Sequence, residues 1–368
     1  MENTEQKSIK SQLDKINEYL MKFSNIPIKE KLFFVKHLSV MLRVGISISD
    51  ALKTLSQQTE NKYFKKVLLE MNRRIENGEN FSQSLKSYPR IFNELFVSMI
   101  EAGEISGKLE EVLGQLFVQL KKEHSLISKV KSALTYPMVI IFAMIGMGIF
   151  MMIVIIPKIT SAFTQMEAEL PLPTKILIKM SDTLIHNGPL TAIVAVLLIV
   201  GFIKFIKSKT GKPIFDLMTI KFPIIGPIIK KINLARFARN ISSLLKTDIM
   251  IVKTFQITAN ILGNSQYKNA LNEMSKKIKK GEKINQMISK YPKLFPPVVT
   301  QMIAIGEETG DLDNILIELA EFYEEEIDQI MTDLPAIIEP LLILLLGVGV
   351  GGMAIAIIMP MYSLSSSI

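Results

Sequence analysis

The sequence matches itself when it is shifted by 203 residues, and this internal repeat limits the possible fold more than any other feature. The stretch GEISGKL at 103–109 recurs as GEETGDL at 306–312, and Pro137 recurs as Pro340. The other matches pair Gly78-Glu79 with Gly281-Glu282, Tyr88-Pro89 with Tyr291-Pro292, and Phe92 with Phe295. One register kept over more than eighty residues without a gap indicates two copies of one structural unit.

Two long apolar runs follow the two copies. Residues 138–156 and 341–359 contain no charged side chain, and at about 1.5 Å per residue each run matches the roughly 30 Å core of a bilayer. A third run, 190–203, is shorter and spans only if it extends past Lys204 to Ile206. The sequence therefore predicts three transmembrane helices. The middle one is required, because without it the two copies would lie on opposite sides of the membrane.

The lysines near these runs predict the orientation. Lys121, Lys122, Lys129 and Lys131 precede the first run, whereas Lys204, Lys207, Lys209 and Lys212 close or follow the second. Basic residues favour the cytoplasmic side, so we expect a cytoplasmic N-terminus and an outside C-terminus. The net charge of +8 then suits an anionic inner leaflet and requires no nucleic acid.

These patterns predict eight segments along the chain. They are an N-terminal amphipathic helix 1–27, a cytoplasmic helical domain 28–137, a first transmembrane helix 138–156, an outside loop 157–188, a second transmembrane helix 189–206, a second cytoplasmic helical domain 207–339, a third transmembrane helix 340–360 and an outside tail 361–368.

Each cytoplasmic copy has apolar residues at helical spacing and no alternating strand pattern. In copy one the spacing predicts helices near residues 32–42, 51–55, 67–75, 81–85, 93–103 and from 109 onward. The fold class is therefore an all-α membrane protein with two homologous bundles of about six helices each. Residues 1–24 carry their own apolar stripe. That stripe fits a helix packed on the bundle, a docking helix for a partner, or a helix lying on the membrane.

The chain lacks the residue patterns of common catalytic sites. It has no cysteine, which excludes disulfides, cysteine-ligated zinc and a cysteine nucleophile, and its three histidines share no motif. GEISGKL is one residue too short between its glycines for a phosphate-binding loop, and Leu109 stands where that loop needs a hydroxyl. We therefore predict no enzyme activity, no cofactor and no metal site within one chain, and we interpret Glu324-Glu325-Glu326 as a solvated helix face. The sequence leaves open an acidic cation site between subunits. A transporter or channel is the alternative function, and a membrane-bound enzyme is a weaker one. The absence of ionisable residues from the two long runs argues against transport.

The paired motif has its own expected structure. Gly103 and Gly306 stand where one apolar helix would end, and Ser106 and Thr309 where the next would be capped. Gly107 and Gly310 share that turn, and Leu109 and Leu312 open the following helix. Glu104 and Glu307 could either orient the turn or face a partner. A second set of glycines, expected to let transmembrane helices pack closely within or between chains, comprises Gly146, Gly148, Gly347, Gly349 and Gly351.

These features together resemble the type II secretion system protein F family, with its type IV pilus assembly protein C branch. The resemblance covers about residue 28 to the C-terminus. It rests on the duplicated bundles, the three spans, the paired G-E-x-[ST]-G-x-L motifs and the stretches ALTYPMVI at 133–140, LPLPTKILIKMSD at 170–182 and FPIIGPIIKKINLARFARNISSLLKT at 222–247. One departure is Asp248, which stands where the first copy has a glycine. Aspartate tolerates a left-handed turn better than most residues, so we expect the fold to be kept.

The resemblance implies a function that composition alone does not. Members of this family are inner-membrane platform proteins without catalytic residues or cofactors. They couple a hexameric cytoplasmic assembly ATPase to pilin or pseudopilin subunits and to other inner-membrane components of the machine. A homo-oligomer is also expected.

Overall fold

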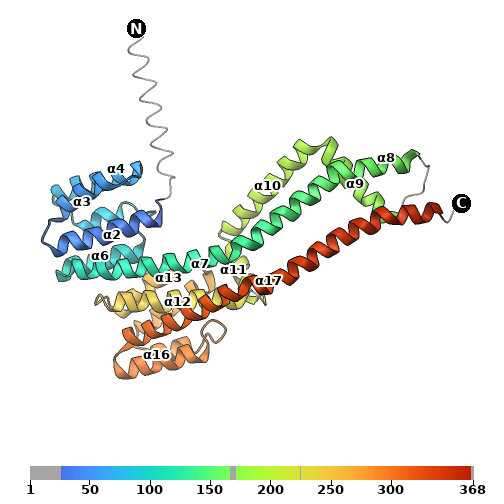
Figure 1. The fold of residues 1–368 in the computed structure, drawn as a ribbon. Coiled ribbons are helices and arrows are strands. Elements are labelled where there is room, and N and C mark those ends of the chain that lie inside the picture. Colours follow the sequence, from blue (N-terminus) through green and yellow to red (C-terminus); the bar gives the residue numbers. More distant parts are fainter. Residues whose placement is uncertain (1–25, 166–170, 224, 366–368) are drawn as a thin grey trace, which may run out of the picture. The chain divides into compact units, whose positions relative to one another are not determined.

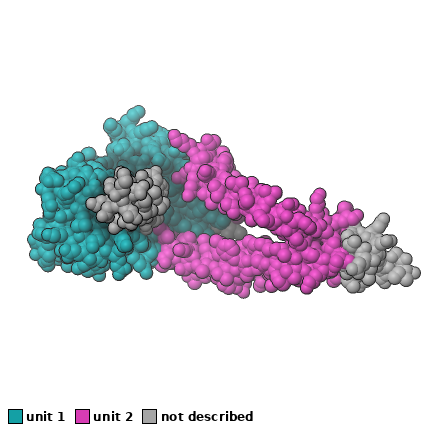
Figure 2. Space-filling model, turned by 90° about the horizontal axis from the view of Figure 1, so that it is seen from above, with its two compact units in different colours: residues 1–126, 223–325 teal, residues 127–222, 326–368 magenta. Residues whose placement is uncertain are grey.

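The computed structural model describes residues 26–165, 171–223 and 225–365, and these are helical throughout apart from turns and short connections (Figure 1). The amphipathic helix expected over residues 1–24 lies outside the described residues. The described chain forms two compact units, residues 1–126 with 223–325 and residues 127–222 with 326–368 (Figure 2). The first unit holds both predicted bundles, and the second holds the apolar parts of the chain.

Copy one is a bundle of six helices, as the sequence predicts. They are α2 (Ile28–Arg43), α3 (Ile48–Gln58), α4 (Lys62–Glu76), α5 (Phe81–Lys86), α6 (Glu94–Ser106) and α7 (Leu109–Phe150). Asn61 and Asn93 cap the starts of α4 and α6, because their side-chain oxygens accept the amides of Phe64 and Phe96. The last helix, α7, continues past the bundle into the first apolar run.

Copy two repeats this order with six helices of its own. They are α12 (Ile225–Leu245), α13 (Ile251–Ile261), α14 (Ser265–Ile278), α15 (Ile284–Ile288), α16 (Pro297–Thr309) and α17 (Leu312–Ser365). Under the 203-residue shift, α13 and α16 have the same bounds as α3 and α6, and α17 begins where α7 begins. The duplication is therefore structural as well as sequential.

An aromatic cluster forms the centre of each bundle. In copy one the ring of Phe34 lies 5.5 Å from that of Phe64 and 6.0 Å from that of Phe92. At the equivalent positions of copy two, the ring of Phe295 lies 5.1 Å from that of Phe237 and 5.4 Å from that of Tyr267. All six side chains are fully buried, so this cluster supplies much of the apolar burial that holds each bundle together.

Asp248 adopts the backbone conformation of the glycine that it replaces. Its φ angle is 59°, and the φ angle of the equivalent Gly45 is 84°. Among the described residues, Asp248 is the one non-glycine residue with positive φ. The prediction that aspartate would keep this turn is confirmed.

The three predicted spans correspond to three helices that are long and apolar enough to cross a membrane. These stretches are Leu109–Ser161, Gly188–Lys207 and Leu312–Ala356, and little of their most apolar parts is buried in the protein. The first stretch contains α7, a short π-helix η1 (Met151–Ile155) and the start of α8 (Ile156–Gln165). The second is α10 (Gly188–Lys207), and the third is most of α17. The remaining helices are α9 (Leu172–His186) and α11 (Gly211–Lys221).

Candidate functional site

The paired GEISGKL and GEETGDL segments form the turns that join α6 to α7 and α16 to α17. Gly107 ends α6 with a φ of 69°, and Gly310 ends α16 with a φ of 76°. This left-handed conformation favours glycine because a Cβ atom would crowd the neighbouring carbonyl. The lysine at position 108 donates its backbone amide to the carbonyl of Gly103, which closes the turn in copy one.

Two expectations for these turns are wrong. The helices do not stop at Gly103 and Gly306 but continue to Ser106 and Thr309. The hydroxyls of Ser106 and Thr309 do not cap the following helices, because each donates to a carbonyl of its own helix, 2.9 Å from Ala102 and 2.8 Å from Ile305. The left-handed glycine follows the hydroxyl residue, so that residue completes the first helix instead of opening the second.

Gly103 and Gly306 instead lie at the closest approach of the two helices that each turn connects. A Cβ atom on Gly103 would lie 3.0 Å from the Val112 side chain and 3.2 Å from the Leu109 backbone. On Gly306 it would lie 3.0 Å from the Leu312 backbone. Leu109 packs against the core of copy one, so the glycine and the leucine of each motif belong to one contact. A larger residue would force the two helices apart.

Glu104 and Glu307 each cap a short helix from across the bundle. The two carboxylate oxygens of Glu104 accept the amides of Phe81, at 2.6 Å, and Ser82, at 3.0 Å, at the start of α5. Glu307 accepts the amides of Ile284 and Asn285 at 2.7 Å and 3.1 Å, at the start of α15. Neither α5 nor α15 has a side-chain bond from its own N-cap residue. The carboxylates therefore satisfy amides that would otherwise lack an acceptor and oppose the positive end of the helix dipole.

A polar network that the sequence did not reveal joins α7, α12 and α17. Glu324 accepts the Nε hydrogen of Arg239 at 2.9 Å and lies 3.1 Å from the Lys122 ammonium. The Arg239 and Glu324 side chains are mostly buried, so reading residues 324–326 as a wholly solvated face is wrong for Glu324. A second pair, Arg236 with Glu123, joins α12 to α7.

Among the described residues, no other helix of this chain packs on the span glycines. A Cβ atom at any of Gly146, Gly148, Gly347, Gly349 or Gly351 would meet no atom within 4 Å. Packing of these glycines between chains stays a prediction.

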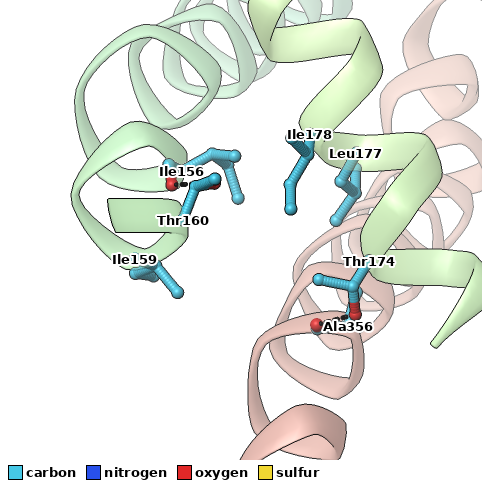
Figure 3. A pocket seen from close by; sticks show the side chains of 7 residues that line it. All are labelled: Ile156, Ile159, Thr160, Thr174, Leu177, Ile178 and Ala356. Atoms are coloured by element: carbon cyan, nitrogen blue, oxygen red, sulfur yellow. Dashed lines mark hydrogen bonds between the residues drawn. The ribbon is translucent and has the colours of Figure 1, made fainter. Parts of the chain in front are cut away.

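The described residues offer little that could hold a small molecule or an ion. A small cavity at the end of the apolar helices is lined by seven mainly apolar residues from α8, α9 and α17, among them Ile156, Leu177 and Ala356 (Figure 3). Within the described ranges, no three acidic, histidine or cysteine side chains are grouped as metal ligands. The geometry instead consists of helix turns, caps and ion pairs that hold two bundles together.

Comparisons with known proteins agree with this architecture. The profile of the family described as "Type II secretion system (T2SS), protein F" matches twice, at residues 34–157 and 237–360, which is the same 203-residue shift. The Type IV pilus assembly protein PilC of Thermus thermophilus is 35% identical over 337 residues, covering 92% of this chain and 83% of that protein. PilC of Myxococcus xanthus is 32% identical, covering 94% of this chain and 83% of that protein.

A secretion protein is similar over nearly the same span. The Type II secretion system protein F of Vibrio cholerae is 28% identical over 332 residues, covering 90% of this chain and 81% of that protein. The duplicated helical bundles, the three membrane-spanning helices and the double family match show together that this chain belongs to the type II secretion system protein F family.

Proposed function

We propose that this protein is the inner-membrane platform of a type IV pilus or type II secretion machine, and that it couples a cytoplasmic assembly ATPase to filament growth. The observation that carries the proposal is the double family match on two bundles, each followed by a membrane-spanning helix. Relatives named for pilus assembly and for type II secretion span more than four-fifths of their own length in this match. The chain has no catalytic role in this proposal.

In this scheme the two bundles face a hexameric ATPase, and the apolar helices and the segment between them contact pilin or pseudopilin. Movement of the ATPase turns or tilts the paired bundles, and the apolar helices pass the movement to the pilin. Two similar bundles give the ATPase two similar surfaces to act on. Other inner-membrane components of the machine and further copies of this chain complete the partners, and no nucleic acid is involved.

The motif glycines offer a direct test of function. Gly103→Leu combined with Gly306→Leu forces apart the helices that each turn connects, and we expect filament assembly to be lost while the protein still inserts into the membrane. Gly114→Ile is the matched control, because a Cβ atom at Gly114 meets nothing within 4 Å and copy two has Ile317 at this position. Normal filaments in the double variant would refute a role for these turns.

Binding of the ATPase is tested separately. The full-length protein in detergent should retain the candidate ATPase on an affinity column, and the Gly103→Leu, Gly306→Leu protein should retain less of it. If the column retains no ATPase from either protein, the coupling scheme is wrong even though the family assignment stands.

The proposed topology places the N-terminus in the cytoplasm, with spans at 138–156, 189–206 and 340–360. Because the chain has no cysteine, single cysteines report orientation without background labelling. Leu172 and Met250 are each 75% exposed and lie on opposite sides in this scheme. Leu172→Cys should react with an impermeant maleimide in intact cells and Met250→Cys only after lysis. The reverse result would invert the topology.

A further inference from the structure

The two bundles of one chain pack head to tail. Helices α6 and α7 of copy one lie on α12 and α13 of copy two. The Gln119 amide donates to Asn240 at 2.7 Å, and the Ser243 hydroxyl donates to Gln119 at 3.1 Å. Between α13 and α6, the Asn260 amide donates to Glu94 at 3.0 Å. The last two helices of one copy therefore cover the first two helices of the next.

A head-to-tail contact uses two different surfaces, so each end of the pair keeps one surface that the contact does not use. The 203-residue shift identifies both. Arg236, Asn240 and Ser243 of the covered α12 correspond to Phe33, His37 and Val40 of α2. Gln119 of α7 corresponds to Phe322 of α17.

Both of these surfaces expose apolar side chains. Phe33, His37, Val40 and Val44 lie along one side of α2, and we call them the α2 face. Phe33, Val40 and Val44 are 38%, 47% and 69% exposed. Phe322, the centre of what we call the α17 face, is 46% exposed. Copy two has polar or charged residues at all four α2-face positions, so the apolar character is specific to copy one.

The two faces also have opposite charges at their margins. Exposed Lys29 and Lys36 flank the α2 face, and exposed Glu318 and Glu325 flank Phe322. Like-charged faces would repel each other, whereas these attract.

We propose that the α2 face binds the α17 face of a second copy of this chain, in the arrangement that α12 and α7 have within one chain. Within one chain, Gln119 lies between Asn240 and Ser243. In the proposed contact, Phe322 of the second chain lies in the same way between His37 and Val40. The apolar pairing replaces the amide and hydroxyl bonds of the internal contact. Because the contact is head to tail, two chains that close on each other form it twice.

Cysteine crosslinking in native membranes tests this arrangement. The double variant Val40→Cys, Phe322→Cys should give a covalent dimer on oxidation or with a short bismaleimide, and neither single variant should. The matched control is Gln119→Cys with Ser243→Cys, which should crosslink within one chain and leave the monomer mass unchanged.

Three outcomes would overturn the proposal. The first is no dimer from the Val40→Cys, Phe322→Cys protein while the control pair crosslinks. The second is a dimer from Val40→Cys alone, which would mean that two α2 faces meet. The third is crosslinking of Val40→Cys to Leu13→Cys within one chain, which would assign the α2 face to the chain's own N-terminal residues.

A different observation carries a second inference, about α9. The hydroxyls of Thr174 and Ser181, seven residues apart on one side of α9, donate to backbone carbonyls of the two long apolar helices. Thr174 donates to Ala356 of α17 at 2.6 Å (Figure 3), and Ser181 donates to Met152 in η1. Both side chains are buried, at 5% and 1% exposure.

Prolines explain why these two carbonyls need a donor. In an α-helix the Ala356 carbonyl would accept the amide hydrogen of residue 360, which is proline. In η1 the bonds follow the π-helical register, in which the amide of Ile156 donates to the carbonyl of Met151, five residues earlier. In this register the Met152 carbonyl would accept the amide hydrogen of residue 157, which is also proline. Pro157 and Pro360 are equivalent under the 203-residue shift.

We infer that α9 is a clasp that joins the two duplicated apolar helices, with Thr174 and Ser181 as its positioning residues. Each hydroxyl satisfies a carbonyl that a proline has deprived of its backbone donor. Because both side chains are buried, little water reaches these carbonyls, so the hydroxyl supplies the missing bond and fixes where α9 meets each helix.

A double-mutant cycle tests the clasp in the full-length protein in detergent. Thr174→Val should lower the midpoint of thermal unfolding. In the Pro360→Ala background, where residue 360 again has an amide hydrogen, most of that fall should disappear. Ser181→Ala with Pro157→Ala should behave alike, and Thr174→Ser should restore the midpoint. Thr183→Val is the control, because that hydroxyl bonds within α9 to Lys179. An equal fall for Thr174→Val with and without Pro360 would refute the clasp.

Discussion

The two bundles bury the same carbonyl group but supply its hydrogen bond from different helices. In copy one the Lys31 ammonium of α2 donates to the carbonyl of Ile91 at 2.7 Å. In copy two the equivalent carbonyl belongs to Leu294 and accepts the Tyr267 hydroxyl of α14 at 2.8 Å. Lys31 becomes Leu234 in copy two, and Phe64 becomes Tyr267. Both copies therefore keep a side-chain donor for this carbonyl. The two sequence differences together move that donor from the first helix of the bundle to the third.

The two donors differ in how they respond to burial. Burial lowers the pKa of Lys31, because its charged ammonium loses hydrating water. Burial raises the pKa of the Tyr267 hydroxyl, because the charged phenolate would lose hydrating water in the same way. The neutral phenol is therefore the donor that is easier to bury. Copy two should lose less free energy to donor desolvation than copy one when this hydrogen bond forms. Five experiments test how far the two copies are equivalent.

The largest effect should come from the aromatic clusters. Phe92→Ala and Phe295→Ala each remove a fully buried ring, and each should lower the free energy of unfolding by about 3–5 kcal/mol. Denaturant unfolding in detergent, followed by circular dichroism, measures the loss. Ile105→Ala is the control, because this side chain is 83% exposed. A loss no larger than that of the control would show that the cluster does not support its bundle.

The exchanged donor can be moved back by mutation. Lys31→Leu leaves the Ile91 carbonyl without its donor and should cost about 1–3 kcal/mol of stability. Adding Phe64→Tyr places in copy one the pair found in copy two, and we expect most of the stability to return. The same unfolding measurement compares the single and double variants. A double variant as unstable as the Lys31→Leu variant would mean that a tyrosine at position 64 cannot replace the lysine as the donor to this carbonyl.

The motif carboxylates should behave alike in both copies. Glu104→Gln and Glu307→Gln each replace one of two accepting oxygens by an amide, and each should cost about 1 kcal/mol. Hydrogen exchange at the first amides of α5 and α15 should become faster by a similar factor in each variant. Glu308→Gln, at an exposed neighbouring position, is the control. Faster exchange in one copy alone would show that the caps are not equivalent.

Alkaline pH should change the stability of the two bundles in opposite directions. The folded pKa of Lys31 lies below its unfolded value, so its burial penalty applies at neutral pH and is relieved as pH rises through the folded pKa. The folded pKa of Tyr267 lies above its unfolded value, so its contribution is present below about pH 10 and is lost above it. Between pH 8 and 11, the protection factors of backbone amides against hydrogen exchange should rise with pH in copy one and fall in copy two. Lys31→Met should remove the first trend, and Tyr267→Phe should remove the second.

The smallest effect concerns the turn at Asp248. Asp248→Gly should stabilise copy two by at most about 1 kcal/mol, because glycine takes positive φ without the Cβ contact. Gly45→Asp should cost copy one a similar amount. Thermal unfolding measures both changes, and a gain from Gly45→Asp would contradict this account of the turn.

The sequence predicted most of the fold because its signals were local or repeated. Helical spacing and the 203-residue shift located six helices in each bundle, and glycine pairs marked the turns. Ser106 was misread because a hydroxyl before an acidic segment is typical of an N-cap, whereas the left-handed Gly107 decides which helix the hydroxyl joins. The acceptor role of Glu104 was missed because its amide partners, Phe81 and Ser82, lie more than twenty residues earlier in the chain. The same holds for Arg239 and Glu324, which are distant in sequence. Tertiary partners of this kind leave no periodic trace.

The continuity of α7 and α17 has a consequence for engineering. Each helix runs without interruption from its bundle into an apolar stretch, so both parts share one helical phase. A single residue inserted near position 127 or 330 would rotate everything beyond it by about 100° about the helix axis, whereas seven inserted residues would nearly restore the phase while adding about 10 Å. In α7 and α17, insertion length, and not residue chemistry, therefore sets the helical phase of the residues that follow the insertion.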